Sequence, residues 1–413
     1  MYIKKVNYWN HSNKLKCVSV DNQESPLISI DIWCKAGVSF ESENKGGTAH
    51  FLEHMIFKGT SKLLPGEFDY RIESFGGSSN ASTGYDDSHY YVLIPPDNFR
   101  ESLSLLTNLV LLPKIDRNEF EKEKLVVIEE IKQQNDQPDE ILFNMFLKKV
   151  WVDNVYSNTI LGEEESIRAL SLEDLWEFHS NRYSLNNLAI AVSGKIPSDI
   201  KIIFEDCNIN ERYSLISQKD QQKFDQKIKN GREIIKFDKL EFSRIFMAWQ
   251  IPCNHYQKLI VGFEVLTSIL VDGKNSKLVK PLKEQNNLVE SIDVDVNAGE
   301  FGSLLILETC CVKENLYLVE EKINEILDKL LNHPDELKHE LRKSLNIIKS
   351  NYFFNLETSS QLSAFYGNNL LWDRYHPLHE LEDYLDYWNN VNNFKEILRF
   401  LLKDKYTLIV EAN

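Results

Sequence analysis

Cysteine is scarce in this sequence and follows no recognisable spacing. Six cysteines are spread over 413 residues, and no Cys-x-x-Cys pair occurs. A chain of this length without a regular cysteine pattern is not expected to rest on a disulfide framework. The sequence also shows no glycine-rich phosphate loop and no Ser/His/Asp signature, which argues against two common classes of catalytic site.

Long apolar runs and an excess of positive charge are also missing. No run approaches the roughly 18 apolar residues that a membrane span needs, and the first residues are not followed by the apolar core of a signal peptide. The formal net charge is −16 at pH 7, and an acidic surface repels nucleic acid and anionic membranes. We therefore expect no nucleic-acid partner, no membrane partner and a cytoplasmic location.

The composition favours a globular protein of more than one domain. Hydrophobic residues make up 42% of the chain and charged residues 27%, which is typical of folded soluble proteins. The polar segment 211–232, rich in lysine and glutamine, is typical of an inter-domain linker. We therefore predict an N-terminal domain at 1–210 and a C-terminal domain at 233–413.

Both predicted domains contain strands and helices in a similar order, which indicates an α+β fold present twice. Residues 27–33 alternate apolar and polar side chains, as a half-buried strand does. A helix is predicted over 48–58, and short strands are predicted near 79–83 and 89–94. Each domain is expected to be an antiparallel or mixed sheet covered by helices, with the repeat visible in pattern and not in residue identity.

The strongest chemical signal is the segment His50-Phe51-Leu52-Glu53-His54. Two histidines at this spacing lie on one face of a helix, where both imidazoles can bind one tetrahedral zinc ion. Glu53 lies at the edge of that face and can accept a proton from a metal-bound water. The order H-x-x-E-H is a zinc-peptidase signature. The alternative is that both histidines are solvated or capping residues on an ordinary amphipathic helix.

A catalytic zinc ion needs a third protein ligand and keeps one open position. The helix predicted over 116–134 offers four carboxylates for this role: Glu121, Glu123, Glu129 and Glu130. Most glutamates on a helix face solvent. Glu130 differs because apolar residues surround it in the sequence, and a carboxylate at an apolar interface needs a partner, of which a metal is one possibility. Glu123 shares a face with it.

Longer stretches around these residues resemble the inverzincin peptidases, peptidase family M16, which include pitrilysin, insulin-degrading enzyme and the mitochondrial processing peptidase. The segment Gly46 to Thr60 is similar to the family's zinc signature, Gly76 to Ala81 to its edge strand, and Glu123 to Ile131 to its glutamate helix. The resemblance implies a LuxS/metalloprotease-like fold. It also implies two homologous domains in a chain that associates in pairs around a closed chamber.

Transferred position by position, the resemblance makes His50, His54 and Glu130 the ligands of one Zn²⁺ per chain. It makes Glu53 the catalytic base and Glu123 a supporting catalytic carboxylate.

It also places Asn80 and Ala81 on the strand that binds an extended peptide through main-chain hydrogen bonds. The implied activity is that of a zinc-dependent metalloendopeptidase acting on oligopeptides or targeting-type peptides.

The second half departs from the family pattern. Where active members carry an arginine and a tyrosine that contact the substrate, this chain has Lys283 and Glu290. Lysine replaces a bidentate arginine poorly, and a glutamate adds negative charge where a donor is needed. We therefore expect a heterodimer in which a homologous subunit supplies the arginine and tyrosine. The alternatives are a homodimer with rebuilt contacts and, in another class, a non-catalytic structural or binding subunit.

Overall fold

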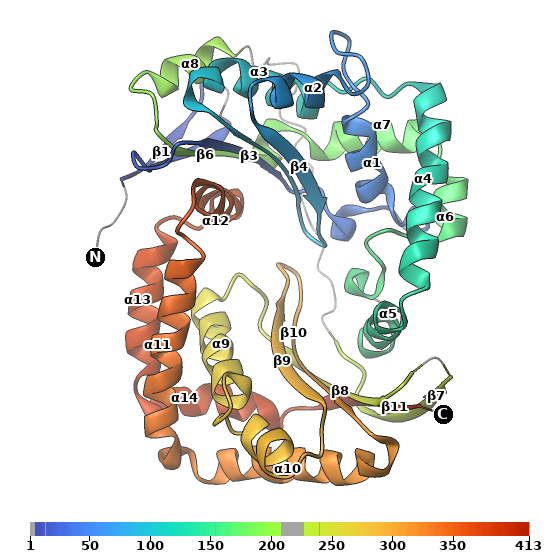
Figure 1. The fold of residues 1–413 in the computed structure, drawn as a ribbon, viewed down its shortest axis with the longest axis vertical. Helices are drawn as coiled ribbons and strands as arrows, with labels where there is room; N and C mark the ends of the chain where they lie inside the picture. Colours follow the sequence, from blue (N-terminus) through green and yellow to red (C-terminus); the bar gives the residue numbers. More distant parts are fainter. Residues whose placement is uncertain (1–4, 13, 153, 208–226, 239, 413) are drawn as a thin grey trace. The chain divides into compact units, whose positions relative to one another are not determined.

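The chain folds into two compact α+β units, shown in Figure 1 as a computed structural model. The structure describes residues 5–12, 14–152, 154–207, 227–238 and 240–412. No helix among these residues is long and apolar enough to cross a membrane. The first unit comprises Met1–Gln134, Asn158–Gln221 and Phe354–Pro377, and the second comprises Asn135–Ser157, Gln222–Phe353 and Leu378–Asn413.

The first unit is built on a six-stranded mixed sheet with the order β1-β2-β6-β3-β5-β4. β2 and β6 are parallel, and all other neighbours are antiparallel. β4 is an edge strand and therefore has one side without a partner strand. The strands are β1 (Val6–Asn10), β2 (Lys16–Asp21), β3 (Ile28–Cys34), β4 (Ser78–Thr83), β5 (Ser88–Ile94) and β6 (Leu188–Gly194).

Helices cover both faces of this sheet. Figure 1 shows α12 on one face and α2, α3 and α8 on the opposite face. The helices of the first unit are α1 (Thr48–Ile56), α2 (Glu67–Ser74), α3 (Phe99–Leu111), α4 (Arg117–Asn135), α6 (Glu164–Ala169), α7 (Leu172–Arg182), α8 (Ile200–Asp206) and α12 (Ser359–Leu371).

Strand β3 has the predicted alternation, but its polar side is not exposed. Ser29 and Asp31 have exposed fractions of 0% and 1%, because α12 covers this side of the sheet. Asp31 accepts hydrogen bonds from the hydroxyls of Ser29 and Ser363, both at 2.6 Å, and pairs with His89 at 2.8 Å. The prediction of a half-buried strand was therefore wrong, since both faces of β3 are buried.

The second unit repeats the topology of the first. Its sheet has the order β7-β11-β8-β10-β9, in which β7 and β11 are parallel and the other neighbours antiparallel. This matches β2-β6-β3-β5-β4 in order and direction, so the predicted repeat is confirmed. The strands are β7 (Gly231–Phe237), β8 (Ser243–Ile251), β9 (Ser291–Ala298), β10 (Ser303–Cys311) and β11 (Lys405–Ala412).

The two halves of the chain exchange helices. α5 comes from the first half but packs on the second sheet, where Phe146 stacks on Phe246 with ring centroids 5.0 Å apart. α12 comes from the second half but packs on the first sheet. The helices of the second unit are α5 (Pro138–Val150), α9 (Gln257–Val271), α10 (Leu316–Asn332), α11 (Lys338–Phe354), α13 (Pro377–Trp388) and α14 (Val391–Leu398), with a π-helix at Lys280–Gln285.

The compact units therefore differ from the sequence-based division at 1–210 and 233–413 in these two exchanged segments. Most of the predicted linker, residues 211–226, lies outside the described residues. Its last residues already belong to the second unit, because Ile228 forms a bridge with Trp151 and β7 begins at Gly231.

Candidate active site

Helix α1 carries the motif His50 to His54, and its start is held by a carboxylate from the segment that precedes it. The Oε1 and Oε2 atoms of Glu41 accept hydrogen bonds from the backbone N–H groups of Ala49 at 2.8 Å and Gly47 at 3.0 Å. These groups lie at the N-terminus of the helix, where no intrahelical acceptor is available. Glu41 therefore supplies the cap that the residue before the helix, Gly47, cannot supply with a side chain.

The three predicted metal ligands converge on one point in the first unit. One ligand atom each of His50, His54 and Glu130 lies within 4.8 Å of the others. The Nε2 atoms of His50 and His54 are 3.8 Å and 3.5 Å from the same oxygen of Glu130. Among the described residues this is the only group of three or more such side chains that could hold a metal ion.

This donor set fits zinc. Ligands about 2.0–2.2 Å from a tetrahedral zinc ion are separated from each other by roughly 3.3 Å, slightly less than the 3.5 Å and 3.8 Å separations here. Two imidazoles and one carboxylate are the ligands of a catalytic zinc site with one position left for water or substrate. Burial, aided by His54, lowers the pKa of His50 to about 4, so its ring is neutral and able to bind a metal near neutral pH.

Glu123 lies behind the ligands and contacts the other side of the His54 ring. Its Oε1 atom is 2.9 Å from Nδ1 of His54, and its Oε2 atom is 2.6 Å from Nζ of Lys58. Burial opposes ionisation of Glu123, but hydrogen bonds from His54 and Lys58 outweigh it and lower its pKa. An ionised Glu123 directs the Nδ1–H of His54 toward itself and so leaves Nε2 free for a metal.

Glu53 points toward the edge strand β4. The hydroxyl of Thr83 donates a hydrogen bond to Oε2 of Glu53. Burial raises the pKa of Glu53, and the Thr83 hydrogen bond partly opposes this effect. A half-buried carboxylate with a raised pKa, beside a metal-binding group, is typical of a general base.

Strand β4, which the sequence predicts to bind peptide, lies at the edge of the first sheet. Asn80 is exposed and Ala81 half-buried. The N–H of Ala81 donates to the side-chain oxygen of Asn80 at 2.9 Å. A peptide that paired with Ala81 at this N–H would have to displace the Asn80 side chain.

The apolar surroundings predicted for Glu130 are only partly present. Val126 is 50% exposed, and the side chain of Glu130 is itself 42% exposed. Glu130 therefore lies at the border of the apolar interface formed by its buried neighbours Val127 and Ile128 and is not enclosed by it. It meets the histidines because it lies on the face of α4 that is turned toward α1.

The sequence interpretation missed Thr83, Lys58 and Glu41. A signal for Thr83 exists, because it is two residues after Ala81 and so shares its face of the strand. Glu41 and Lys58 lie close to the motif in sequence, but nothing in the sequence says that their side chains turn back toward it.

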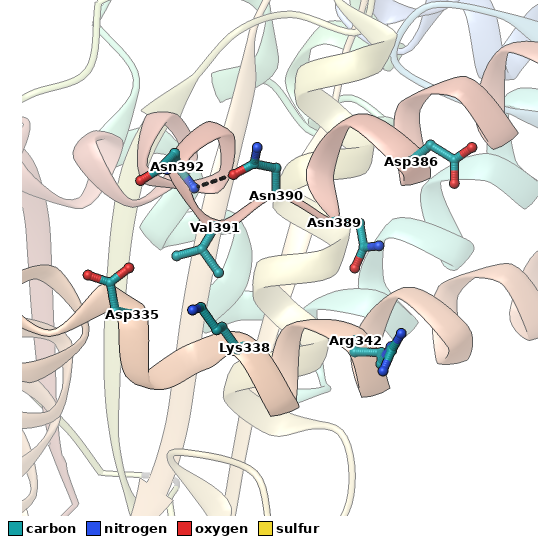
Figure 2. Close-up of a pocket in the computed structure, with 8 residues that line it drawn as sticks. All are labelled: Asp335, Lys338, Arg342, Asp386, Asn389, Asn390, Val391 and Asn392. Atoms are coloured by element: carbon teal, nitrogen blue, oxygen red, sulfur yellow. Dashed lines mark hydrogen bonds between the residues drawn. The ribbon is translucent and has the colours of Figure 1, made fainter.

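An open groove lies elsewhere, on the second unit. It has a volume of about 620 Å³, and Figure 2 shows the side chains that line it between α11 and the α13–α14 connection. Its charges are balanced, with Lys338 and Arg342 facing Asp335 and Asp386. The groove shares no residue with the group formed by His50, His54 and Glu130.

The residues that replace the expected arginine and tyrosine are both exposed in the second unit. Lys283 lies in the π-helix Lys280–Gln285, and Glu290 directly precedes β9. The side chain of Lys283 makes no hydrogen bond or ion pair among the described residues, and the backbone N–H of Glu290 donates to the carbonyl of Cys310 at 2.8 Å.

Two family models match the chain. Insulinase (Peptidase family M16) matches residues 16–164, and Peptidase M16 inactive domain matches residues 169–345. The chain belongs to peptidase family M16. The first match contains the whole metal-binding group, and the second covers a part of the chain in which no further group of this kind is found among the described residues.

Two relatives of this M16 chain match most of its length. It is 27% identical over 405 residues to the uncharacterized zinc protease YmxG of Bacillus subtilis, covering 96% of this chain and 95% of that protein. It is 24% identical over 384 residues to the human mitochondrial-processing peptidase subunit beta, covering 89% and 77%. A crystal structure of a protease from Helicobacter pylori has the same fold, with a TM-score of 0.88, 24% identity and coverage of 99% and 100%.

Proposed function

We propose that this chain is a zinc-dependent endopeptidase that carries the zinc site of a two-subunit M16 enzyme. The observation that carries the proposal is the convergence of His50, His54 and Glu130 on one point. Glu53 lies on the same helix, next to a sheet edge that has no partner strand. Metal ligands, a base and a peptide-binding edge are the parts that metal-assisted peptide hydrolysis requires.

Each part has a separate task in the proposed reaction. An extended peptide adds to β4 as a further strand, with Ala81 and Asn80 contacting its main chain. Zinc, when bound, polarises the scissile carbonyl and makes a water molecule more acidic. Glu53 accepts the proton of the attacking water and delivers it to the leaving amine. Glu123 keeps the ring of His54 oriented throughout.

The second subunit is inferred from what the chain lacks. Lys283 and Glu290 replace two residues that contact substrate in active members, and a lost preorganised donor typically costs about 3 kcal/mol of transition-state stabilisation. The name of the human relative, a subunit beta, marks that protein as part of a larger enzyme. A heterodimer with a homologous chain restores the missing donors, whereas a homodimer requires other residues to replace them. A cytoplasmic location stays a prediction.

The activity is tested by replacing Glu53 with Gln. We expect kcat to fall by about 10²–10⁴-fold on a mixed peptide library, because the water loses its base, while zinc content measured by atomic absorption stays near that of the wild type. Exposed Glu43, replaced by Gln, is the matched control. Equal turnover of Glu53→Gln and wild type would contradict the proposed base. His54→Ala and Glu130→Ala should both lose zinc.

The rival function, a non-catalytic structural or binding subunit, is supported by the same two replacements in the second half. It predicts no turnover by the wild-type chain, whether alone or with a homologous partner from the same source. Two measurements separate the alternatives: the mass of the purified chain by light scattering, and its turnover with and without that partner. A heterodimer is active only with the partner, a homodimer is active alone at twice the mass of the chain, and a non-catalytic subunit is inactive in both cases. Full turnover by the chain alone would remove the reason for a second subunit.

A further inference from the structure

Two hydroxyl side chains of strand β4 donate hydrogen bonds to carboxylates of the neighbouring helices α1 and α2. Ser79, Ala81 and Thr83 share its half-buried face, while the alternate residues are exposed. The hydroxyl of Ser79 donates to Asp69 of α2 at 2.8 Å, and the hydroxyl of Thr83 donates to Glu53 of α1. Thr83 is thus the direct link between the proposed substrate strand and the proposed base.

Thr83 is the only hydrogen-bonding partner of Glu53 among the described residues. The Thr83 hydroxyl binds Oε2, and Oε1 has no hydrogen-bonding partner in the part of the chain that the structure describes. A glutamate side chain has several freely rotating bonds, and a general base must lie within about 2.6–3.2 Å of the proton that it accepts. One hydrogen bond to one oxygen therefore selects the orientation in which the other oxygen can meet a water molecule.

The backbone of Thr83 is itself held firmly. Thr83 ends β4, and the following turn closes with a hydrogen bond from Gly84 N–H to the carbonyl of Asp87 at 2.8 Å. The carboxylate of Asp87 accepts hydrogen bonds from Asn368 of α12 at 2.9 Å and from the indole of Trp372 at 3.3 Å. The turn that follows Thr83 is therefore fixed by a helix from the other half of the chain, so the hydroxyl has a defined place from which to hold Glu53.

We propose that Thr83 is a positioning residue that aligns the Glu53 carboxylate with a peptide bound on the same strand. This inference rests on the proposed function, because it takes Glu53 to be the base and β4 to be the substrate strand. Thr83 acts on the chemical step and not on peptide binding, since its side chain faces α1 and leaves the open edge untouched. Loss of its hydroxyl should therefore lower kcat and leave KM nearly unchanged.

The test compares Thr83→Val, which keeps the shape and removes the donor, with Thr83→Ser, which keeps the donor. We expect Thr83→Val to lower kcat by about 10–100-fold with KM changed less than about threefold and zinc content unchanged. Thr83→Ser should recover most of the lost kcat. Ser74→Ala is the control, because it removes an exposed hydroxyl of α2 that donates to the backbone of Arg71 and lies outside β4, and its kcat should equal that of the wild type.

A second measurement does not depend on activity. In crystal structures of the metal-free proteins, we expect one Glu53 rotamer in the wild type and in Thr83→Ser, and several rotamers in Thr83→Val. A single unchanged rotamer in Thr83→Val overturns the proposal, as does a Thr83→Ser variant with kcat as low as that of Thr83→Val. If the wild type hydrolyses no peptide but these rotamers differ as expected, the proposed function fails while the positioning role of Thr83 holds.

Discussion

The two ring nitrogens of His54 contact different carboxylates. Nδ1 is 2.9 Å from Glu123, and Nε2 is 3.5 Å from Glu130. Glu123 and Glu130 are seven residues apart, so they lie on one face of α4 two turns apart. The spacing places both near α1, but their roles differ. Glu130 joins the group that would bind metal, and Glu123 orients a ligand.

The separate role of Glu123 leads to a prediction about metal affinity. Glu123→Gln should weaken zinc binding by about 10–100-fold, because a neutral amide holds the Nδ1–H of His54 and the charge of Lys58 less well. Competition with a fluorescent chelator measures this affinity. The control is Glu121→Gln, an exposed position on the same helix. Equal affinities for the two variants would show that Glu123 does not act through His54.

At the scale of elements, the second unit contains a buried acid that the first-unit site does not use. Glu264 of α9 lies against α11, where the hydroxyl of Tyr352 donates to both of its oxygens at 3.2 Å and 3.3 Å. Burial raises the pKa of Glu264 to about 7, although the Tyr352 hydrogen bond opposes this. The folded chain therefore holds this proton more tightly than the unfolded chain, where the ordinary pKa of a glutamate applies.

This difference makes the stability of the second unit depend on pH. The contribution of protonated Glu264 to the free energy of unfolding is fully present below the ordinary glutamate pKa of about 4.3. It is lost as pH rises through about 7. Between about pH 4 and pH 8 the free energy of unfolding should fall by about 3 kcal/mol more in the wild type than in Glu264→Gln, as measured by urea denaturation. Glu284→Gln, at an exposed position, should behave like the wild type. If the free energy of unfolding depended on pH in the same way in the wild type and in Glu264→Gln, Glu264 would not have the raised pKa described here.

Helix α12 is an element whose packing depends on one small residue. A methyl group added at Gly367 would lie 2.6 Å from the ring of Trp33 and 2.9 Å from the side chain of Ala191. Gly367 therefore lets α12 approach the first sheet closely enough for Ser363 to reach Asp31.

Gly367→Ala should lower the free energy of unfolding by about 1–3 kcal/mol, because overpacking outweighs the gain of about 1 kcal/mol in helix propensity. Urea denaturation measures the change. The control is Gly46→Ala, whose added methyl would meet nothing closer than 3.8 Å. A stabilised Gly367→Ala would mean that α12 does not pack on Trp33 as described.

At the scale of the whole molecule, each unit is completed by a segment from the other half of the chain. The first sheet needs α12 to bury Ser29 and Asp31, and the second sheet needs α5 to cover Phe246. Because the first unit also contains the metal-binding group, metal binding and the folding of both halves of the chain are thermodynamically linked.

Removal of metal should therefore affect both activity and stability. A strong chelator should abolish peptide hydrolysis and lower the melting temperature, since zinc at about 1,000 times its Kd stabilises the folded state by about 4 kcal/mol. Added zinc should restore both. The melting temperature of His54→Ala should respond to neither chelator nor zinc. An unchanged melting temperature of the wild type after complete removal of zinc would argue against a site formed only in the folded chain.

The sequence by itself determined the parts of this protein that depend on short spacings. His50, Glu53 and His54 share a helix face, and Glu123 and Glu130 share another, because the helix repeat of 3.6 residues dictates it. The alternation of β4 and the repeated order of elements follow from equally local patterns. The spacing predicted the two histidine ligands and the base, and the resemblance to family M16 added Glu130 as the third ligand and β4 as the substrate strand.

The tertiary structure alone decided which side chains meet across long stretches of chain. Thr83 reaches Glu53, and Ser363 of α12 reaches Asp31. The exchange of α5 and α12 and the burial of the polar side of β3 likewise depend on contacts between segments that are far apart in the sequence. No local period encodes such contacts, because they form only when distant segments pack together and remove each other's surfaces from water.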